Sequence, residues 1–410
     1  MFKRALLALV ISGCLVGCAM GQASCISHPT KLSCELPIAT HAPGTNLTFF
    51  NPLFGTQLSQ LPFPAASSGF VLGFDKALGI PTFTAGSLGP LLTSRAETVG
   101  RHKLFLSFSF QQFRFETLDG LDMKHLSLEE TFQNPNNPSQ TIYQTQIARI
   151  DARINQYVGT ATFGITDHID VSVALPFERV SLGAGVTGNE NIVTGGSVSV
   201  VPLNQFVPGS SSGIGDLTLN LKVAPFKTES VKIAGGAEFR FPTGDELNYL
   251  GSGAYGVKPY FIISKQLKYI TPHLNVGYQW NGFSNLNPSQ TNSGLGANLR
   301  LPDSIIFAAG FDTRFTRRFT FAADFLGQHF NNAPRISPST TPVPQPGGGS
   351  IDYATVTPSN GSYNVNNVAL GVKVNPFKRL VISGNVLIKV NEGGLRAKYV
   401  PLVGLAYTFH

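Results

Sequence analysis

Apolar and polar residues alternate in segments of about ten residues from residue 103 to the C-terminus. Successive side chains of a β-strand point to opposite faces, so a period of two is typical of strands with one apolar and one polar face. We count twelve such segments. The clearest runs from Asp216 to Val223, with Leu or Val at every odd position and Asp, Thr, Asn or Lys at every even one.

The connections between these segments alternate between tight turns and long loops. Tight turns are predicted at 164–167, 225–228, 265–268, 316–318 and 375–379. Long loops rich in Gly, Ser, Asn and Pro are predicted at 117–142, 181–212, 243–254, 282–301 and 331–362, with a shorter one at 391–398. Short periplasmic turns, long external loops and an even strand number are typical of bacterial outer-membrane barrels.

The pattern therefore predicts an all-β fold, an antiparallel transmembrane β-barrel of twelve strands over residues 103–410. A first hairpin within residues 24–102 would raise the count to fourteen. The apolar faces would contact outer-membrane lipid and the polar faces would line the lumen. The alternative is a soluble, secreted β-sandwich, which would have to expose the polar face of every strand.

The end of the chain supports the barrel. Val403, Leu405, Tyr407 and Phe409 alternate with other residues, and His410 follows. This resembles the aromatic-terminated last strand through which such barrels reach the outer-membrane assembly machinery, which we expect as a partner. Aromatic residues also gather at the ends of the predicted strands, where membrane barrels carry their aromatic girdles.

The N-terminus has the features of a secretory signal peptide over residues 1–23. Lys3 and Arg4 precede a short apolar stretch and then small residues. Two cleavage sites fit: Leu15–Cys18 resembles a lipobox, which would make Cys18 the lipidated first residue, whereas Gly21–Ala23 suits cleavage before Ser24. We expect export to the bacterial outer membrane in either case.

Residues 24–102 are Pro-rich and only weakly alternating, which predicts an N-terminal periplasmic extension or a partial plug. Cys25 and Cys34 remain after either cleavage, in an oxidising compartment, and a local disulfide between them is the economical pairing.

Composition and charge narrow the function classes. Only 13% of the residues are charged, and the mean hydropathy of +0.08 is too low for a polytopic helical membrane protein. The net charge of +7 is dispersed along the chain, so we expect no nucleic-acid partner. The sequence has neither a CxxC spacing nor clustered His residues, and no nucleotide-binding pattern, so we expect no metal and no cofactor.

The stretch from Gly159 to Trp280 resembles an outer-membrane transporter family. The motifs that carry the resemblance are Gly164–Asp170, Gly213–Leu217, Pro242–Asp245, Gly251–Gly253 and Thr271–Tyr278. The family is named for the meta-pathway of phenol degradation. The resemblance implies an outer-membrane channel for passive passage of small-molecule solutes, and the family's name suggests aromatic or other hydrophobic compounds.

The polar strand faces supply the predicted pore-lining charges. These are Arg149, Asp151, Arg153, Asp170, Asp216, Lys222, Lys232, Glu238, Arg240, Lys258, Asp312, Asp324, Lys373 and Lys389. Charges of both signs can form a constriction that screens solutes, or an internal lattice of salt bridges that holds the barrel rigid. The two interpretations are compatible.

Two other function classes are alternatives to the channel. A structural barrel without transport would display the loops at 117–142 and 331–362. An outer-membrane hydrolase would need a Ser and His pair, such as His125 with Ser127, or His168 and Ser172 on the face of Asp170. Neither set has a GxSxG elbow or an evident third partner, so we predict no enzyme activity and no catalytic residues.

Overall fold

The computed structural model describes residues 31–34, 50–58, 60–62, 72–75, 80–83, 88–89, 91–134, 136–228, 230–284, 286, 299–316, 318–377 and 379–409. The predicted signal peptide, Cys18 and Cys25 lie outside this part of the chain. Cys34 is disulfide-bonded, with a partner outside the described residues, so its pairing with Cys25 stays a prediction. Within the described part, no helix has the length and apolar character needed to span a membrane.

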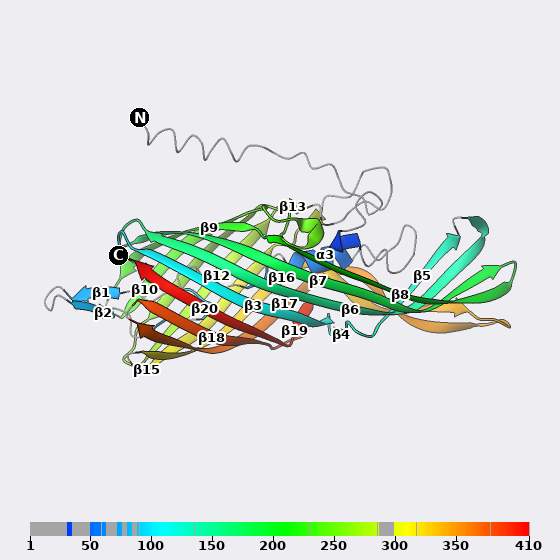
Figure 1. Ribbon diagram of the computed structural model, residues 1–410. Coiled ribbons are helices and arrows are strands. Elements are labelled where there is room, and N and C mark those ends of the chain that lie inside the picture. Colours follow the sequence, from blue (N-terminus) through cyan, green and yellow to red (C-terminus); the bar gives the residue numbers. More distant parts are fainter. Residues whose placement is uncertain are drawn as a thin grey trace, which may run out of the picture.

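Twelve antiparallel strands form a closed barrel (Figure 1). They are β3 (Leu104–Leu118), β6 (Asn137–Gly164), β7 (Ile169–Thr194), β9 (Leu217–Lys227), β10 (Val231–Phe241), β11 (Gly256–Lys265), β12 (Ile270–Asn281), β15 (Ser304–Thr316), β16 (Phe319–Pro344), β17 (Ser350–Phe377), β18 (Leu380–Lys389) and β20 (Tyr399–Phe409). Each pairs with the next, and β3 closes the ring by pairing with both β6 and β20. The predicted twelve-stranded barrel is confirmed.

The remaining elements lie inside the barrel or at its ends. They are η1 (Leu32–Cys34), α3 (Phe50–Leu58), β1 (Leu72–Asp75), β2 (Ile80–Phe83), β4 (Leu121–Asp122), β5 (Leu126–Asn134), β8 (Ser197–Ile214), η3 (Glu246–Asn248), β13 (Phe283–Ser284), β14 (Leu299–Arg300) and β19 (Leu395–Ala397). Strands β1 and β2 form a separate two-stranded sheet beyond one end of the barrel (Figure 1), so they add no strand to its wall.

The outer face of the barrel wall is apolar over most of its height. On β7 and β9, Val173 and Leu221 are exposed, whereas Thr218 and Lys222 on the opposite face are buried. Aromatic side chains form a row across three strands, with Phe110 opposite Tyr157 and Tyr157 opposite Phe177. An outward apolar band edged by aromatic residues is the surface that an outer-membrane barrel presents to lipid, which confirms the predicted outer-membrane location.

The two ends of the barrel differ as predicted, with short turns at one end and long connections at the other. Tight turns connect β6 to β7, β9 to β10, β11 to β12, β15 to β16 and β17 to β18, at the end where β20 also finishes (Figure 1). Short turns and chain ends lie on the periplasmic side of such barrels. The opposite end, with the long connections, is therefore extracellular.

Three of the predicted external loops are β-structure instead. The segments 117–142, 181–212 and 331–362 contribute to hairpins β5–β6, β7–β8 and β16–β17, which continue beyond the barrel as an extracellular extension (Figure 1). Their Ser, Thr and Asn residues are interspersed with Val and Ile, which pair well across strands. Gly195 and Gly196, with φ of +56° and +88°, form the tight turn between β7 and β8.

The polarity of the two strand faces reverses where the wall passes into the extension. On β6, Ala148, Ile150, Ala152 and Ile154 are buried in the interior. Arg149, Asp151 and Arg153 lie on the outer face, and the Arg153 and Asp151 side chains are 45% and 43% exposed. The prediction that these three residues line the pore is therefore wrong. Beyond the bilayer the outside of the wall meets water, so the charged face turns outward and the apolar face forms a core.

Leu219 tests the assignment of the lipid-facing side. It lies opposite the outward-facing Val173 in the middle of β9. Leu219→Arg should destabilise the inserted barrel by about 2–4 kcal/mol, because a lipid-facing charge at mid-membrane depth is desolvated. Ser199→Arg, an exposed position of the extension, is the matched control. The fraction of heat-modifiable protein in the outer membrane measures assembly, and equal assembly of the two variants would contradict the assignment.

The extension contains one carboxyl group in an unusual setting. Glu130 on β5 is buried opposite Gln144 of β6. Among the described residues, neither Glu130 carboxyl oxygen has a hydrogen-bond partner. Burial, together with the neighbouring Glu129, raises the pKa of Glu130 from 4.5 to about 8. The folded extension thus holds a proton that an unfolded chain would release above pH 4.5.

Because the folded extension binds more protons than the unfolded one between pH 4.5 and about 8, its stability should fall as pH rises through this range. Glu130→Gln should remove most of this slope. Glu116→Gln on β3 should leave it in place. Hydrogen exchange of residues 126–134, corrected for the intrinsic pH dependence of exchange, measures the local stability. An unchanged slope in Glu130→Gln would rule out this titration.

Candidate functional site in the barrel lumen

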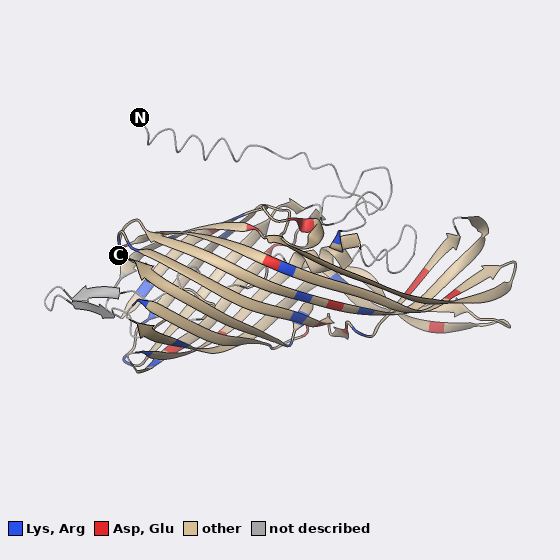
Figure 2. Ribbon diagram, in the orientation of Figure 1, with Lys and Arg blue, Asp and Glu red and all other residues tan. Residues whose placement is uncertain are grey.

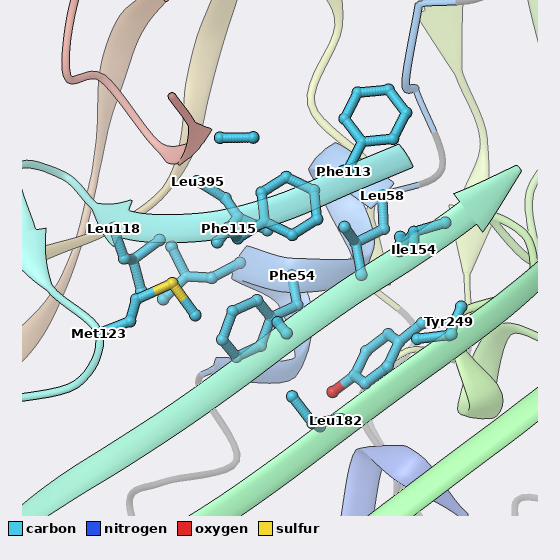
Figure 3. Close-up of a cluster of buried hydrophobic side chains, with 14 of the residues drawn as sticks. Phe54, Leu58, Phe113, Phe115, Leu118, Met123, Ile154, Leu182, Tyr249 and Leu395 are labelled. Carbon is cyan, nitrogen blue, oxygen red and sulfur yellow. The ribbon is translucent and has the colours of Figure 1, made fainter. Parts of the chain in front are cut away.

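Helix α3 lies inside the extracellular half of the barrel lumen (Figure 3). Its side chains Phe54 and Leu58 pack among Phe113, Phe115 and Ile154 of the wall (Figure 3). All nine residues of α3 are buried. A helix this short is marginal by itself, so its packing against the wall supplies most of its stability.

Polar contacts fix α3 to strands on both sides of the lumen. The Gln57 amide donates a hydrogen bond of 2.8 Å to the Tyr363 hydroxyl, and its oxygen accepts one from the Leu395 backbone N–H. The Tyr249 hydroxyl donates to Oδ1 of Asn51 at 2.7 Å. The helix is thus anchored to β17, to β19 and to the loop after η3.

Residues 91–99, which we call the strap, lie inside the periplasmic half of the barrel. Wall carboxylates accept hydrogen bonds from the backbone of the strap. The N–H groups of Leu91 and Leu92 both donate to Oδ2 of Asp324 at 3.1 Å. The Val99 N–H donates to Oδ2 of Asp170 at 3.0 Å. Backbone N–H groups removed from water need such partners, and ionised acceptors make the strong ones.

A buried ion pair joins the middle of the strap to the wall. The Arg95 guanidinium bonds both carboxylate oxygens of Asp312, and the two side chains are 3% and 0% exposed. Lys373 lies in the same cluster, close enough to interact electrostatically with Arg95 and Asp312. Removing one partner of a buried pair leaves an uncompensated charge, so this contact holds the strap in place.

Further polar contacts surround this pair. Nε2 of His273 lies 2.7 Å from the Thr93 hydroxyl and 3.0 Å from Oδ1 of Asp324. Lys222 donates to the carbonyl oxygen of Glu97 and lies 3.5 Å from Asp170, while the Glu97 carboxylate pairs with Lys232 at 3.0 Å. Five charged side chains of the wall are therefore engaged by one short segment.

The other predicted pore-lining residues on the inner face form separate pairs. Glu238 and Lys258, opposite each other on β10 and β11, are 2.7 Å apart. Asp216 accepts hydrogen bonds from the N–H groups of Gly244 and Ser252 and lies 3.7 Å from Nε of Arg240. Lys389 pairs with Glu392 at 2.7 Å. Whether any of these charges contacts a passing solute stays a prediction.

A cavity of about 280 Å³ lies in the lumen between α3 and the strap. Gln57 and Leu61 line the cavity on its extracellular side. Leu92, Thr93 and Ser94 of the strap line it on its periplasmic side. Apolar wall residues dominate the remaining lining; they include Phe113, Phe115, Ile262, Ala308, Leu326 and Val365. Polar side chains such as Tyr260, Asn275 and Gln328 interrupt this surface. An apolar cavity with a few polar groups is the usual form of a small-molecule site.

The residues considered for hydrolysis are not brought together. His125 is exposed and lies 3.0 Å from its neighbour Asp122, on the extracellular side of the barrel. His168 is exposed in a periplasmic turn, whereas Asp170 and Ser172 are buried on the inner face. Asp170 is engaged by the strap, and Ser172 accepts a hydrogen bond from Thr162. The structure therefore gives neither set the arrangement of a catalytic triad.

Several residues of the lumen were missed by sequence reasoning. Arg95, Glu97 and Gln57 come from the Pro-rich segment, which lacks the period of two that identified the wall. His273 belongs to the motif Thr271–Tyr278, and its inward direction follows from the outward-facing Leu274 and Val276 beside it. The sequence did contain one signal for the strap: Arg95 and Glu97 are charged residues of opposite sign, two positions apart, shortly before the first wall strand.

The family resemblance is confirmed by comparison with protein-family models. The family described as "Putative MetA-pathway of phenol degradation" matches residues 133–330, just under half of the chain. The matched region runs from the end of β5 to β16 and contains the strands that carry the motifs identified above. Comparison with the curated proteins gives no match.

Solved structures similar to this chain include several outer-membrane proteins. The COG4313 outer membrane channel from Pseudomonas putida F1 is 12% identical, with a TM-score of 0.45 over 77% of this chain and 98% of that one. The Ralstonia pickettii toluene transporter TbuX is also 12% identical, with a TM-score of 0.34 over 76% and 90% of the two chains. A Pseudomonas aeruginosa FadL homologue is 8% identical, with a TM-score of 0.30 over 75% and 88%.

Arg95→Ala tests whether the buried ion pair holds the strap. Loss of the guanidinium leaves Asp312 buried without this partner, at a cost of about 3–5 kcal/mol that detachment of the strap would relieve. We expect larger or more frequent conductance steps in planar bilayers. Lys265→Ala, which removes an exposed charge at the periplasmic end of β11, is the control. Currents of Arg95→Ala that match those of the control would show that the strap is held by its other contacts.

Proposed function

We propose that this protein is a passive outer-membrane channel whose central cavity binds a small, mainly apolar solute in transit. The observation that carries the proposal is the cavity itself, enclosed by the barrel wall and bounded by α3 and the strap. Its size limits the solute. An apolar cavity of about 150 Å³ holds benzene, so this one accommodates a single substituted aromatic ring.

The chemistry of the lining supports an amphipathic solute. Phe113, Phe115 and Phe330 offer aromatic contacts to a ring, while Gln328, Asn275 and Tyr260 can bind a hydroxyl or carbonyl group. The family match and the structural similarity to a toluene transporter agree with this class of solute. Transport needs no energy coupling in this scheme, because the solute moves down its own gradient.

The two inner segments divide the pathway into three parts. A solute from outside passes α3 to reach the cavity, and then passes the strap to reach the periplasm. The charged residues of the periplasmic half bind the strap in this arrangement, so we assign them to holding a gate rather than to selecting ions. This assignment combines the two interpretations of the lumen charges, a constriction that screens solutes and an internal lattice of salt bridges, because the salt bridges then hold the segment that controls passage.

A cavity-filling variant tests the proposal. Ala308 is buried on β15 and lines the cavity. Ala308→Trp should fill the space, reduce toluene binding by at least tenfold and abolish protein-dependent toluene uptake by cells. Ala354→Trp, at an exposed position of the extension, adds the same side chain away from the cavity and should behave as wild type. Heat modifiability establishes that each variant is folded.

The outcome also separates the channel from a barrel that only displays its surface. Surface display without transport is the second candidate function. The observation that favours it is the extracellular extension, which has buried residues of its own. If cells carrying folded wild-type protein take up toluene no faster than cells without it, and purified protein is silent in bilayers, the channel proposal fails. Surface display is then the better interpretation.

A further inference from the structure

Three arginines lie side by side on the outer surface of the barrel, and we call them the arginine patch. They are Arg114 on β3, Arg153 on β6 and Arg179 on β7, and all three are exposed. Figure 2 shows the basic positions as neighbouring blue bands on these adjacent strands. None of them faces the lumen, so the patch is separate from the cavity and from the strap.

The strand register fixes the spacing within the patch. Arg114 is directly opposite Arg153, and Arg179 is opposite Asn155, one step along the same face from Arg153. Directly opposed residues have Cβ atoms about 5 Å apart, and diagonal neighbours about 7–8 Å apart. All three guanidinium groups can therefore reach one group of phosphate size.

The charge of the patch is only partly balanced by the protein. Arg153 bonds Asp151, with N–O distances of 2.9 and 2.6 Å. Across the part of the chain that the structure describes, Arg114 and Arg179 form no ion pair. Glu116 lies two residues beyond Arg114 on the side away from the membrane. Like charges directly opposite each other destabilise a sheet, so a bound anion would relieve the repulsion between Arg114 and Arg153.

The position of the patch identifies the kind of anion. The next row towards the periplasm is the aromatic row, in which the ring centroids of Phe110 and Tyr157 are 4.9 Å apart and those of Tyr157 and Phe177 are 6.5 Å apart. Below this row the wall is apolar, with exposed Phe108 and Leu175. The patch thus lies at the extracellular interface of the membrane, where lipid headgroups meet the wall.

We propose that the arginine patch binds the phosphate groups of a glycolipid in the outer leaflet, with the acyl chains of that lipid along the apolar wall below. Guanidinium groups bind phosphate through paired, charge-assisted hydrogen bonds, and basic clusters beside a membrane interface recognise lipid headgroups. The aromatic row favours a lipid over a soluble anion, because one molecule then satisfies both the charged and the apolar surface. The proposal rests on the membrane location and not on transport.

The test uses full-length protein in detergent and native mass spectrometry with lipid A that carries two phosphates. Arg114→Gln with Arg179→Gln removes two patch charges and leaves the Arg153–Asp151 pair. Arg314→Gln with Arg318→Gln removes two exposed charges at the periplasmic end and is the matched control. Wild type and control should bind the lipid, and the patch variant should bind it at least tenfold more weakly.

Two further arms identify the ligand. Removing the phosphates from lipid A should weaken its binding to wild-type protein at least as much as the patch substitutions weaken the binding of phosphorylated lipid A. Inorganic phosphate at millimolar concentration should displace little of the lipid. Equal lipid binding by the patch variant and the control, no effect of the lipid phosphates, or complete displacement by inorganic phosphate would each overturn the proposal. Toluene binding by the same patch variant should be unchanged, which separates this result from the test of the channel.

Discussion

Closure of the sheet is the constraint on which the rest of the structure depends. No water is available inside a bilayer to pair with backbone N–H and C=O groups, so every strand must find partners on both edges. The double pairing of β3, with β6 on one side and β20 on the other, meets this requirement. It also encloses a lumen into which the polar faces of twelve strands point. The candidate functional parts are all defined by this closed wall: α3 and the strap lie inside it, the extension continues beyond it, and the arginine patch lies on its outer surface.

The strap, which lies inside the lumen, also has backbone N–H groups that are removed from water and need hydrogen-bond acceptors. The strap does not pair as a strand, so its N–H groups need other acceptors. Asp324 and Asp170 supply them from the wall, and Arg95 in turn neutralises Asp312. These three carboxylates, which look like pore charges in the sequence, are therefore acceptors and counter-ions for an internal segment. The proposed gate can be held firmly by such contacts and still be released, because water can replace each contact when the strap leaves.

The sequence predicted the wall well because lipid imposes one rule on every strand. Apolar residues had to alternate with others, and turns had to be short on one side, so strand number and topology followed from the pattern. The rule fails where the lipid ends. On β6 the apolar residues change face near Ile154. From Ala148 to Ile154 they point into the interior, because water and not lipid contacts the outside of this extracellular part of the strand, whereas Tyr157 and Phe163, nearer the periplasm, point outward. Alternation shows that a strand has two faces, and only the depth of the residue in the membrane shows which face is which.

The lumen was harder to predict because its contacts are not periodic. Gln57 contacts a tyrosine 306 positions later in the chain, and Arg95 contacts an aspartate 217 positions later. Such pairs depend on closure of the barrel, which brings together residues without any local signal. The same is true of the arginine patch, where Arg114, Arg153 and Arg179 are far apart in sequence and adjacent only through strand register. Once register is known, a row of side chains around the wall can be interpreted as a single surface. On this barrel such rows run from apolar through aromatic to basic, in the order that a lipid presents its chains and its headgroup.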